Sequence, residues 1–247
     1  MSKDAKLDKE GNYSIVNGQF ECDGYLILRH STLSSTILEL SDVFTEVKKK
    51  FDSDDVVLNR NLIKRFADCP EVARIFSSPE LEFFLKKYLY IEWPVFCGPI
   101  VSHYTSNNMT GNSFGLPFHQ DYPSMGSSKN AVITWFALQD CSAETHSLSV
   151  IPGKHKQGVL SGEQGLTSYE PNLLERDLDR QSVLEISAGD VLIMSCYLPH
   201  KTYVNHQYLG EKLSLSRRFD DLNNQEWVSR RYENAYGTTV DRTLWKS

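Results

Sequence analysis

Long apolar runs, an excess of basic residues and paired cysteine motifs are all missing from this chain of 247 residues. No segment approaches the roughly 18 apolar residues that a membrane-spanning helix needs, so we expect no membrane partner. The formal net charge is −6 and the lysines and arginines are scattered. This argues against a nucleic-acid partner, because that function needs a basic face. Residues 1–12 are polar and lack the apolar centre of a secretory signal.

The cysteines form an odd set with no Cys-x-x-Cys spacing. This is typical of reduced, mostly buried thiols in a cytoplasmic protein, and a structural disulfide is the less favoured alternative. Because 40% of the residues are hydrophobic, the chain can bury a core without disulfides. The cysteines are Cys22, Cys69, Cys97, Cys141 and Cys196.

Helical and β-type patterns occupy different parts of the chain. Apolar residues recur at three and four over residues 33–51, and shorter helices are expected around residues 61–66 and 79–90. A short strand is expected just after Asp23-Gly24. From residue 94 onward, short β-type runs are divided by Gly, Asn, Ser and Pro, which predicts a sandwich or jelly roll. The expected strands cover residues 98–105, 132–138, 147–151, 183–186, 190–196, 202–205 and 212–219.

We therefore expect one domain over residues 1–247, mainly β with N-terminal helices. Its expected parts are a mobile leader (1–12), a helical support (13–93), a β core (94–220) and a C-terminal arm (221–247). There is no internal repeat, and the oligomeric state stays open.

A candidate metal site is the most informative feature. His119 and Asp121 are two residues apart, so on a strand they point to the same face. His200 lies 79 residues further along, after the apolar run 191–197. Two imidazoles and one carboxylate without cysteine form the ligand set of a mononuclear non-haem Fe(II) oxygenase. The alternative is a chance pairing of ordinary polar side chains.

The remaining histidines have simpler interpretations. We expect a structural role for His155, in a Pro-Gly-Lys-His-Lys turn. The others are interpreted as ordinary polar or core residues, and they are His30, His103, His146 and His206.

Several segments around the candidate ligands follow one another in a typical order and spacing. They are Phe20-Glu-Cys-Asp-Gly-Tyr-Leu-Ile-Leu28, His119-Gln-Asp-Tyr122, Trp135 with Ala137-Leu138, Leu148-Ser-Val-Ile-Pro-Gly-Lys-His-Lys-Gln-Gly158, and Ala188-Gly-Asp-Val191 followed by His200-Lys-Thr and Asn205. With these segments the chain resembles, over most of its length, the phytanoyl-CoA dioxygenase family of Fe(II)/2-oxoglutarate oxygenases.

The resemblance implies a double-stranded β-helix (a cupin-like jelly roll) that holds Fe(II) through His119, Asp121 and His200. It also implies 2-oxoglutarate as co-substrate, O₂ as oxidant, and oxidation of an unactivated C–H bond. Relatives that chlorinate replace the carboxylate ligand by a small residue. Because Asp121 is present, hydroxylation is expected rather than halogenation.

The anchor for the distal carboxylate of 2-oxoglutarate departs from the family pattern. The family generally places an Arg-x-Ser about eleven residues after the distal histidine, where this chain has Glu211. The best match is Lys212-Leu-Ser214, after a loop one residue longer. On a strand, Lys212 and Ser214 share a face with Ser216 and Arg218.

We expect both Lys212 and Arg218 near the co-substrate, with either as the main contact and Arg217 facing the other way. The alternative is a solvated strand edge. Thr202 matches a family hydroxyl position near the co-substrate, and Trp135 matches an aromatic of the pocket wall. Ser102 and Tyr104 are further candidate donors, with ordinary strand alternation equally open.

The predicted function is hydroxylation of a small, polar metabolite or natural-product intermediate, with release of succinate and CO₂. Cyclisation, epimerisation or desaturation by the same cofactors stay open. A non-catalytic cupin-like binding protein is disfavoured, because the three metal ligands are all present. The loop 122–130 is expected to border the pocket, and no long basic stripe suits a coenzyme A thioester.

Overall fold

The computed structural model of this protein describes residues 14–17, 19–29, 32–50, 55–107, 115–125, 127–165 and 168–229. The expected mobile leader lies outside the described residues, and so does the expected C-terminal arm from residue 230 onward. No helix among the described residues is long and apolar enough to cross a membrane.

Four helices precede most of the β structure. They are α2 (Thr32–Lys49), α3 (Val56–Ala67), α4 (Pro70–Phe76) and α5 (Pro79–Leu89). The shorter helical segments are α1 (Phe20–Asp23), η2 (Lys154–Gln157), α6 (Tyr122–Met125), α7 (Glu175–Leu178) and α8 (Gln225–Ser229).

Local chemistry explains where these helices begin. The Asp55 carboxylate accepts hydrogen bonds from the backbone N–H groups of Val57 and Leu58, which caps α3. Ser78 caps α5 by accepting from Leu81 N–H, and Pro79 occupies the first helical position, where no N–H partner is needed. Helix α4 was not predicted, because seven residues are too few to reveal a helical period.

The strands form one large sheet and two small ones, all antiparallel. The order of the large sheet is β1-β2-β10-β5-β12-β3, and β4 also pairs with β12. Its strands are β1 (Ser14–Asn17), β2 (Tyr25–Arg29), β3 (Pro94–Phe96), β4 (Val101–Ser106), β5 (Val132–Ala137), β10 (Val191–Ser195) and β12 (Glu211–Asp221). The second sheet has the order β11-β6-β9, from His200–Tyr203, Ser147–Val150 and Ser182–Val183. A β7-β8 hairpin joins Gly162–Gln164 to Tyr169–Pro171.

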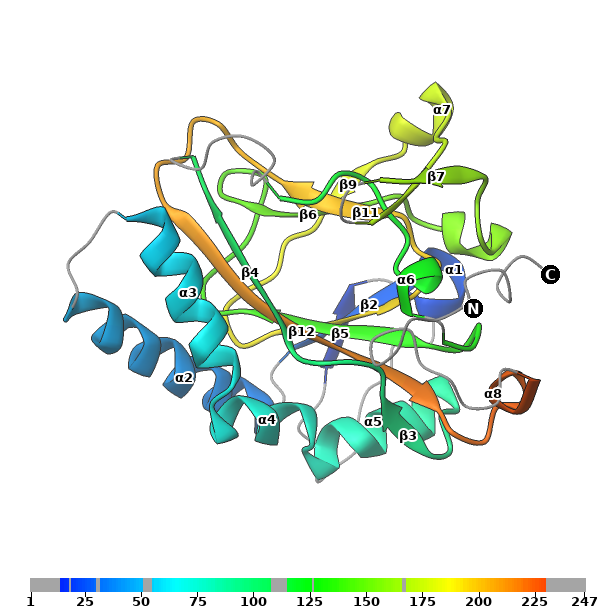
Figure 1. The fold of residues 1–247 in the computed structure, drawn as a ribbon, viewed down its shortest axis with the longest axis horizontal. Coiled ribbons are helices and arrows are strands. Elements are labelled where there is room, and N and C mark those ends of the chain that lie inside the picture. The colour runs from blue at the N-terminus through cyan, green and yellow to red at the C-terminus, as the bar shows by residue number, and fades with distance from the viewer. Residues whose placement is uncertain are drawn as a thin grey trace.

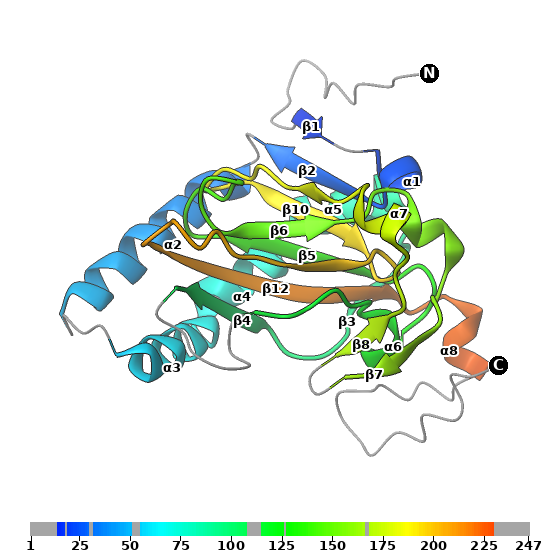
Figure 2. The ribbon, with the colours of Figure 1, turned by 90° about the horizontal axis from the view of Figure 1, so that it is seen from above.

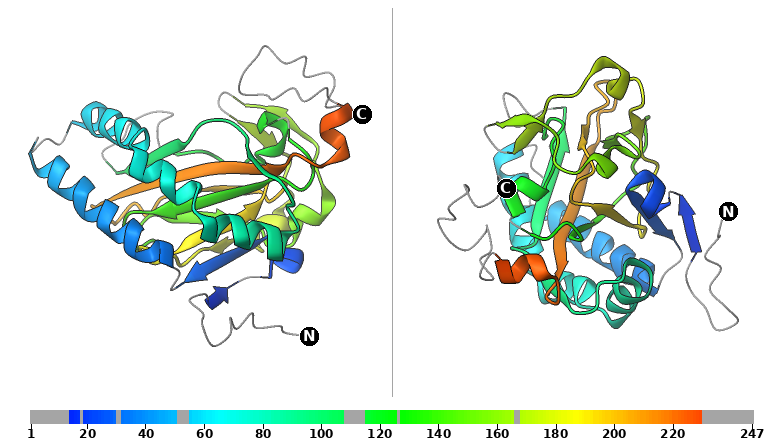
Figure 3. Two further views of the ribbon diagram at one scale, coloured as in Figure 1. Left: turned by 90° about the horizontal axis from the view of Figure 1, so that it is seen from below. Right: turned by 90° about the vertical axis from the view of Figure 1, so that its right-hand side faces the viewer.

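The large sheet lies between two layers. Helices α2 to α5 cover its outer face (Figures 1 and 3), and the β11-β6-β9 sheet lies opposite its inner face (Figures 1 and 2). Along β5, Val132 and Phe136 pack toward the helices, whereas Ile133 and Trp135 pack toward the second sheet. Both faces of this strand are buried, which explains why Thr134 is the one polar residue in an otherwise apolar strand.

Strand β12 breaks this apolar pattern on its inner face. Leu213 and Leu215 pack among the helix-facing residues, so the intervening residues face the second sheet. Those residues are Lys212, Ser214, Ser216 and Arg218, and all four are buried. A polar row enclosed between two sheets is the place where the fold can support a site.

Candidate metal centre and co-substrate pocket

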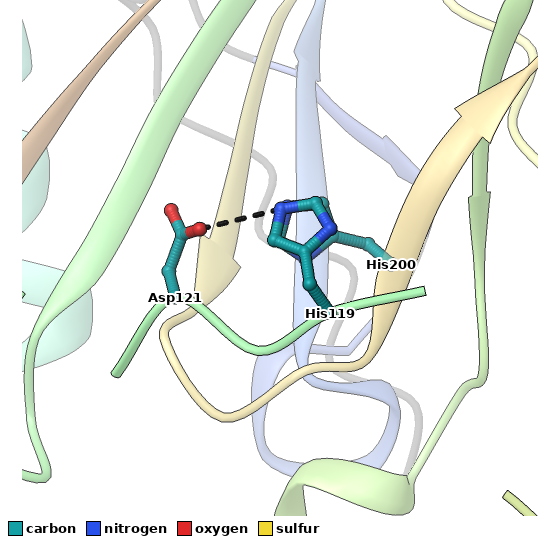
Figure 4. Close-up of side chains that lie close together, drawn as sticks. All are labelled: His119, Asp121 and His200. Atoms are coloured by element: carbon teal, nitrogen blue, oxygen red, sulfur yellow. Dashed lines mark ion pairs between the residues drawn. The ribbon is translucent and has the colours of Figure 1, made fainter. Parts of the chain in front are cut away.

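His119, Asp121 and His200 meet at one end of the space between the sheets (Figure 4). His119 and His200 form an isolated antiparallel bridge, in which the N–H of each donates to the carbonyl of the other at 2.9 and 3.1 Å. Asp121 follows directly and precedes α6. Two segments that are far apart in the sequence are therefore joined at the ligands themselves.

The side chain of Gln120 anchors the His119–Asp121 segment through hydrogen bonds to neighbouring backbone groups. Its side chain is fully buried, and its amide nitrogen donates to the carbonyls of Gly158 and Tyr197 at 2.9 and 2.6 Å. Its amide oxygen accepts from Leu160 N–H at 2.9 Å. Sequence reasoning did not single out Gln120, because a residue between two ligands carries no chemical signature of its own.

The three side chains present a compact set of donor atoms. One potential ligand atom from each residue lies within 4.8 Å of the other two, and all three residues are buried. The His119 and His200 ring centroids are 4.1 Å apart, and His119 Nε2 lies 3.4 Å from Asp121 Oδ1. No other group of three His, Cys, Asp or Glu side chains among the described residues has this geometry.

Backbone carbonyls fix which nitrogen of each imidazole is available. His119 Nδ1 lies 2.8 Å from the Pro117 carbonyl, and His200 Nδ1 lies 2.9 Å from the Leu198 carbonyl. A carbonyl only accepts, so each Nδ1 carries the proton and each neutral ring offers its Nε2 lone pair. This is the usual support of metal-ligating histidines.

Burial and charge keep the ligands in the forms that bind a cation. Burial lowers the pKa of His200 to about 4, so its ring is neutral at physiological pH. Burial alone would raise the pKa of Asp121, but the positive charge of Arg218 holds it well below its usual value. The set of two imidazoles and one carboxylate therefore fits Fe(II).

Arg218 lies directly beside the candidate metal ligands. Its Nε and Nη2 donate to Asp121 Oδ2 at 3.0 and 2.8 Å, and its Nη1 donates to Ser216 Oγ at 3.3 Å. Arg217 faces away, with its guanidinium 3.4 Å from the ring centroid of Phe96.

Lys212 lies further along the same face of β12 and is only 1% exposed. Its Nζ donates to the Ser147 carbonyl at 2.8 Å and lies 5.9 Å from the centroid of the Trp135 ring. No ion pair of Lys212 is found among the described residues. Beside it, the hydroxyl of Ser214 is buried and has no hydrogen-bond partner in the described part of the chain.

A cavity of about 400 Å³, open solvent at its mouth included, connects these groups. It reaches from His119 and His200 to Lys212, with Trp135 and Thr202 in its wall. The other lining residues are His103, Leu116, Ile133, Leu148, Met194, Ser214, Ser216 and Arg218.

The structure differs from the sequence expectation on strand β4. In the antiparallel register His103 lies opposite Ser214, whereas Ser102 and Tyr104 lie opposite Leu215 and Leu213. Residues opposite each other share a face. Ser102 and Tyr104 therefore face the helix layer and do not reach the cavity.

His103, expected to be an ordinary polar or core residue, faces the cavity instead, with Nε2 3.4 Å from Ser216 Oγ. The missing information was the register with β12, which assigns the faces of a strand whose own sequence alternates only weakly.

The other histidines lie away from the candidate ligands. His155 packs against Gly24, where an added Cβ would lie 2.5 Å from its ring. His146 contacts the Gly210 carbonyl and the Asn205 N–H. His206 is exposed, and His30 lies outside the described residues.

Comparisons with known proteins agree with this geometry. The family model described as phytanoyl-CoA dioxygenase matches residues 20–207. No match was found among the curated proteins.

Several solved structures share the fold. The apo form of EctD from S. alaskensis matches with a TM-score of 0.61 and 16% identity, over 83% of this chain and 75% of that chain. The carbocyclase SnoK from nogalamycin biosynthesis matches with a TM-score of 0.58 and 14% identity, over 90% and 92%. The epimerase SnoN, in complex with Fe³⁺ and alpha-ketoglutarate, matches with a TM-score of 0.53 and 15% identity, over 82% and 80%.

These structural likenesses are too distant in sequence to indicate more than the fold. The family match covers well over half of the chain, and His119, Asp121 and His200 all lie within it. The chain thus belongs to the phytanoyl-CoA dioxygenase family of Fe(II)/2-oxoglutarate oxygenases.

Proposed function

We propose that this protein is an Fe(II)/2-oxoglutarate-dependent dioxygenase that hydroxylates a C–H bond of a small, polar metabolite. The observation that carries the proposal is the buried cluster of His119, Asp121 and His200 beside the cavity. These residues would hold the iron through two Nε2 atoms and Asp121 Oδ1. When bound, iron with 2-oxoglutarate and O₂ supplies the oxidant, and succinate and CO₂ are released. The two facing sheets would be the halves of a double-stranded β-helix.

Lys212 and Ser214 are the proposed anchor for the distal carboxylate of 2-oxoglutarate. Among the described residues, the buried Lys212 ammonium hydrogen-bonds only a neutral carbonyl, so it is poorly compensated, and a carboxylate would compensate it. The buried hydroxyl of Ser214 is a second donor for the same group. Arg218 is the weaker candidate as the main anchor, because Asp121 already pairs with it.

The cavity supports a compact substrate. The cavity volume of about 400 Å³ includes open solvent at its mouth and must also accommodate 2-oxoglutarate, which favours a compact second molecule. The walls combine apolar side chains such as Ile133 and Met194 with the polar groups of His103 and Thr202, which suits a small polar metabolite or natural-product intermediate.

Hydroxylation is proposed over halogenation because Asp121 occupies the carboxylate position. Epimerisation or cyclisation is the second candidate, since SnoN and SnoK share the fold. A cytoplasmic location is proposed because all five cysteines are free thiols.

Metal binding and co-substrate turnover test the proposal. We expect the Fe(II)-loaded protein to release succinate from 2-oxoglutarate, and His119→Ala or Asp121→Ala to abolish both iron binding and turnover. His206→Ala is the matched control, because this exposed histidine lies outside the cavity. Turnover that survives either ligand substitution would refute the assignment, and iron binding without any turnover would favour a non-catalytic binding protein.

A further inference from the structure

We infer that Arg218 is a positioning residue, which fixes the Asp121 carboxylate so that Oδ1 alone is presented to the metal. The inference rests on the proposed function, because it assigns a task to a residue beside the proposed metal ligands. It also gives Arg218 a different role from Lys212, although both side chains lie on the same face of β12.

The contacts of Asp121 are divided between its two oxygens. Arg218 Nε and Nη2 both donate to Oδ2, at 3.0 and 2.8 Å. Oδ1 lies on the other side, 3.4 Å from His119 Nε2. Because two donors hold Oδ2, rotation of the carboxylate would break both hydrogen bonds, and Oδ1 stays directed at the imidazoles (Figure 4).

Arg218 is itself held in place. Its Nη1 donates to Ser216 Oγ, and its carbonyl accepts from Cys97 N–H at 2.9 Å. Its backbone pairs with Ile133 in the middle of the large sheet, and the residue is only 6% exposed. Because hydrogen bonds hold both its backbone and its guanidinium, Arg218 can keep the Asp121 carboxylate in one orientation.

A guanidinium suits this task better than an ammonium ion. Its planar fork can place two parallel N–H groups on one carboxylate, whereas an ammonium is a compact point charge. Residues that orient a ligand in this way typically change metal affinity by about 10- to 100-fold when they are replaced.

The test compares metal binding in three variants without relying on turnover. Arg218→Gln removes the charge, Arg218→Lys keeps the charge without the fork, and Arg217→Gln removes the neighbouring charge on the opposite face. Mn²⁺ affinity is measured by calorimetry, and the visible absorption of bound Co²⁺ reports the coordination geometry. Circular dichroism confirms folding, and Arg218→Lys keeps the test decisive if Arg218→Gln does not fold.

We expect Arg218→Gln to weaken Mn²⁺ binding by about 10- to 100-fold and to change the Co²⁺ spectrum. Arg218→Lys should recover part of the affinity but not the spectrum, and Arg217→Gln should match the wild type. The inference is overturned if the Arg218 variants bind Mn²⁺ and Co²⁺ as the wild type does and only lose affinity for 2-oxoglutarate. If wild-type protein binds neither metal, the proposed function fails as well.

Discussion

Lys212 introduces a titratable charge into the interior of the protein. Burial lowers its pKa from 10.5 to about 8. The titratable groups that interact electrostatically with it include His103 from β4, Cys141 after β5 and His146 before β6. Burial lowers the pKa of His103 to about 3 and also lowers that of His146, and it raises the pKa of Cys141 to about 12. All three are neutral near pH 7, so none of them compensates the ammonium.

This environment predicts that co-substrate binding depends on pH. Above about pH 8 the empty site loses the Lys212 proton, so the affinity for 2-oxoglutarate should fall by about tenfold per pH unit and stay constant just below pH 8. Calorimetry with Mn²⁺ in place of iron, in the absence of O₂, measures this dependence. Lys212→Arg is the control, because a guanidinium keeps its proton and should remove the slope. A slope that persists in this variant would assign it to another group.

At the scale of elements, apolar periodicity was a good guide to the helices and a poorer one to the site. Helix α2 follows the expected spacing, with Leu33, Ile37 and Phe44 buried, although Val43 in the same pattern is half-exposed. The alternation of β12 correctly predicted which of its residues share a face. The alternation of β4 did not, because its faces are set by pairing with β12. Long-range register is therefore the part that local patterns could not supply.

The hydrogen bonds of Gln120 link the His119–Asp121 segment to Gly158 and Tyr197, and a substitution can test this link. Gln120→Ala would remove the hydrogen bonds to Gly158, Tyr197 and Leu160 and leave these backbone groups without their partner. We expect the free energy of unfolding to fall by about 2–4 kcal/mol, measured by urea denaturation. Gln164→Ala, at an exposed position of β7, should cost less than about 0.5 kcal/mol. Equal effects of the two substitutions would contradict a linking role for Gln120.

At the scale of the whole molecule, the site depends on how the two sheets and the helix layer pack together, which no single sequence motif shows. Motifs and spacing predicted the ligands because the resemblance covers both His119 and His200. Their closeness in space comes from the bridge between distant segments, which periodicity cannot show. The helix layer packs against the outer face of the sheet, and Phe136 from β5 contacts Phe76 of α4 with ring centroids 5.4 Å apart.

Removing that contact should destabilise the entire fold. Phe136 is fully buried, so Phe136→Ala should lower the free energy of unfolding by about 3–5 kcal/mol. Phe83→Ala is the control, because Phe83 is 44% exposed on the same helix layer and its loss should cost far less. Urea denaturation followed by circular dichroism measures both, and a Phe136 variant as stable as the Phe83 variant would refute the importance of this layer contact.

Lys212 and Arg218 lie an even number of positions apart on β12, and this spacing limits which insertions and deletions the strand can accept. Because neighbouring residues of a strand face opposite sides, inserting or deleting one residue between the two cations would turn one of them toward the helix layer. We therefore expect this strand to tolerate length changes between the two cations only in pairs. A mutational scan with single and double insertions after Ser214 would reveal this two-residue rule, with function lost at one and partly regained at two.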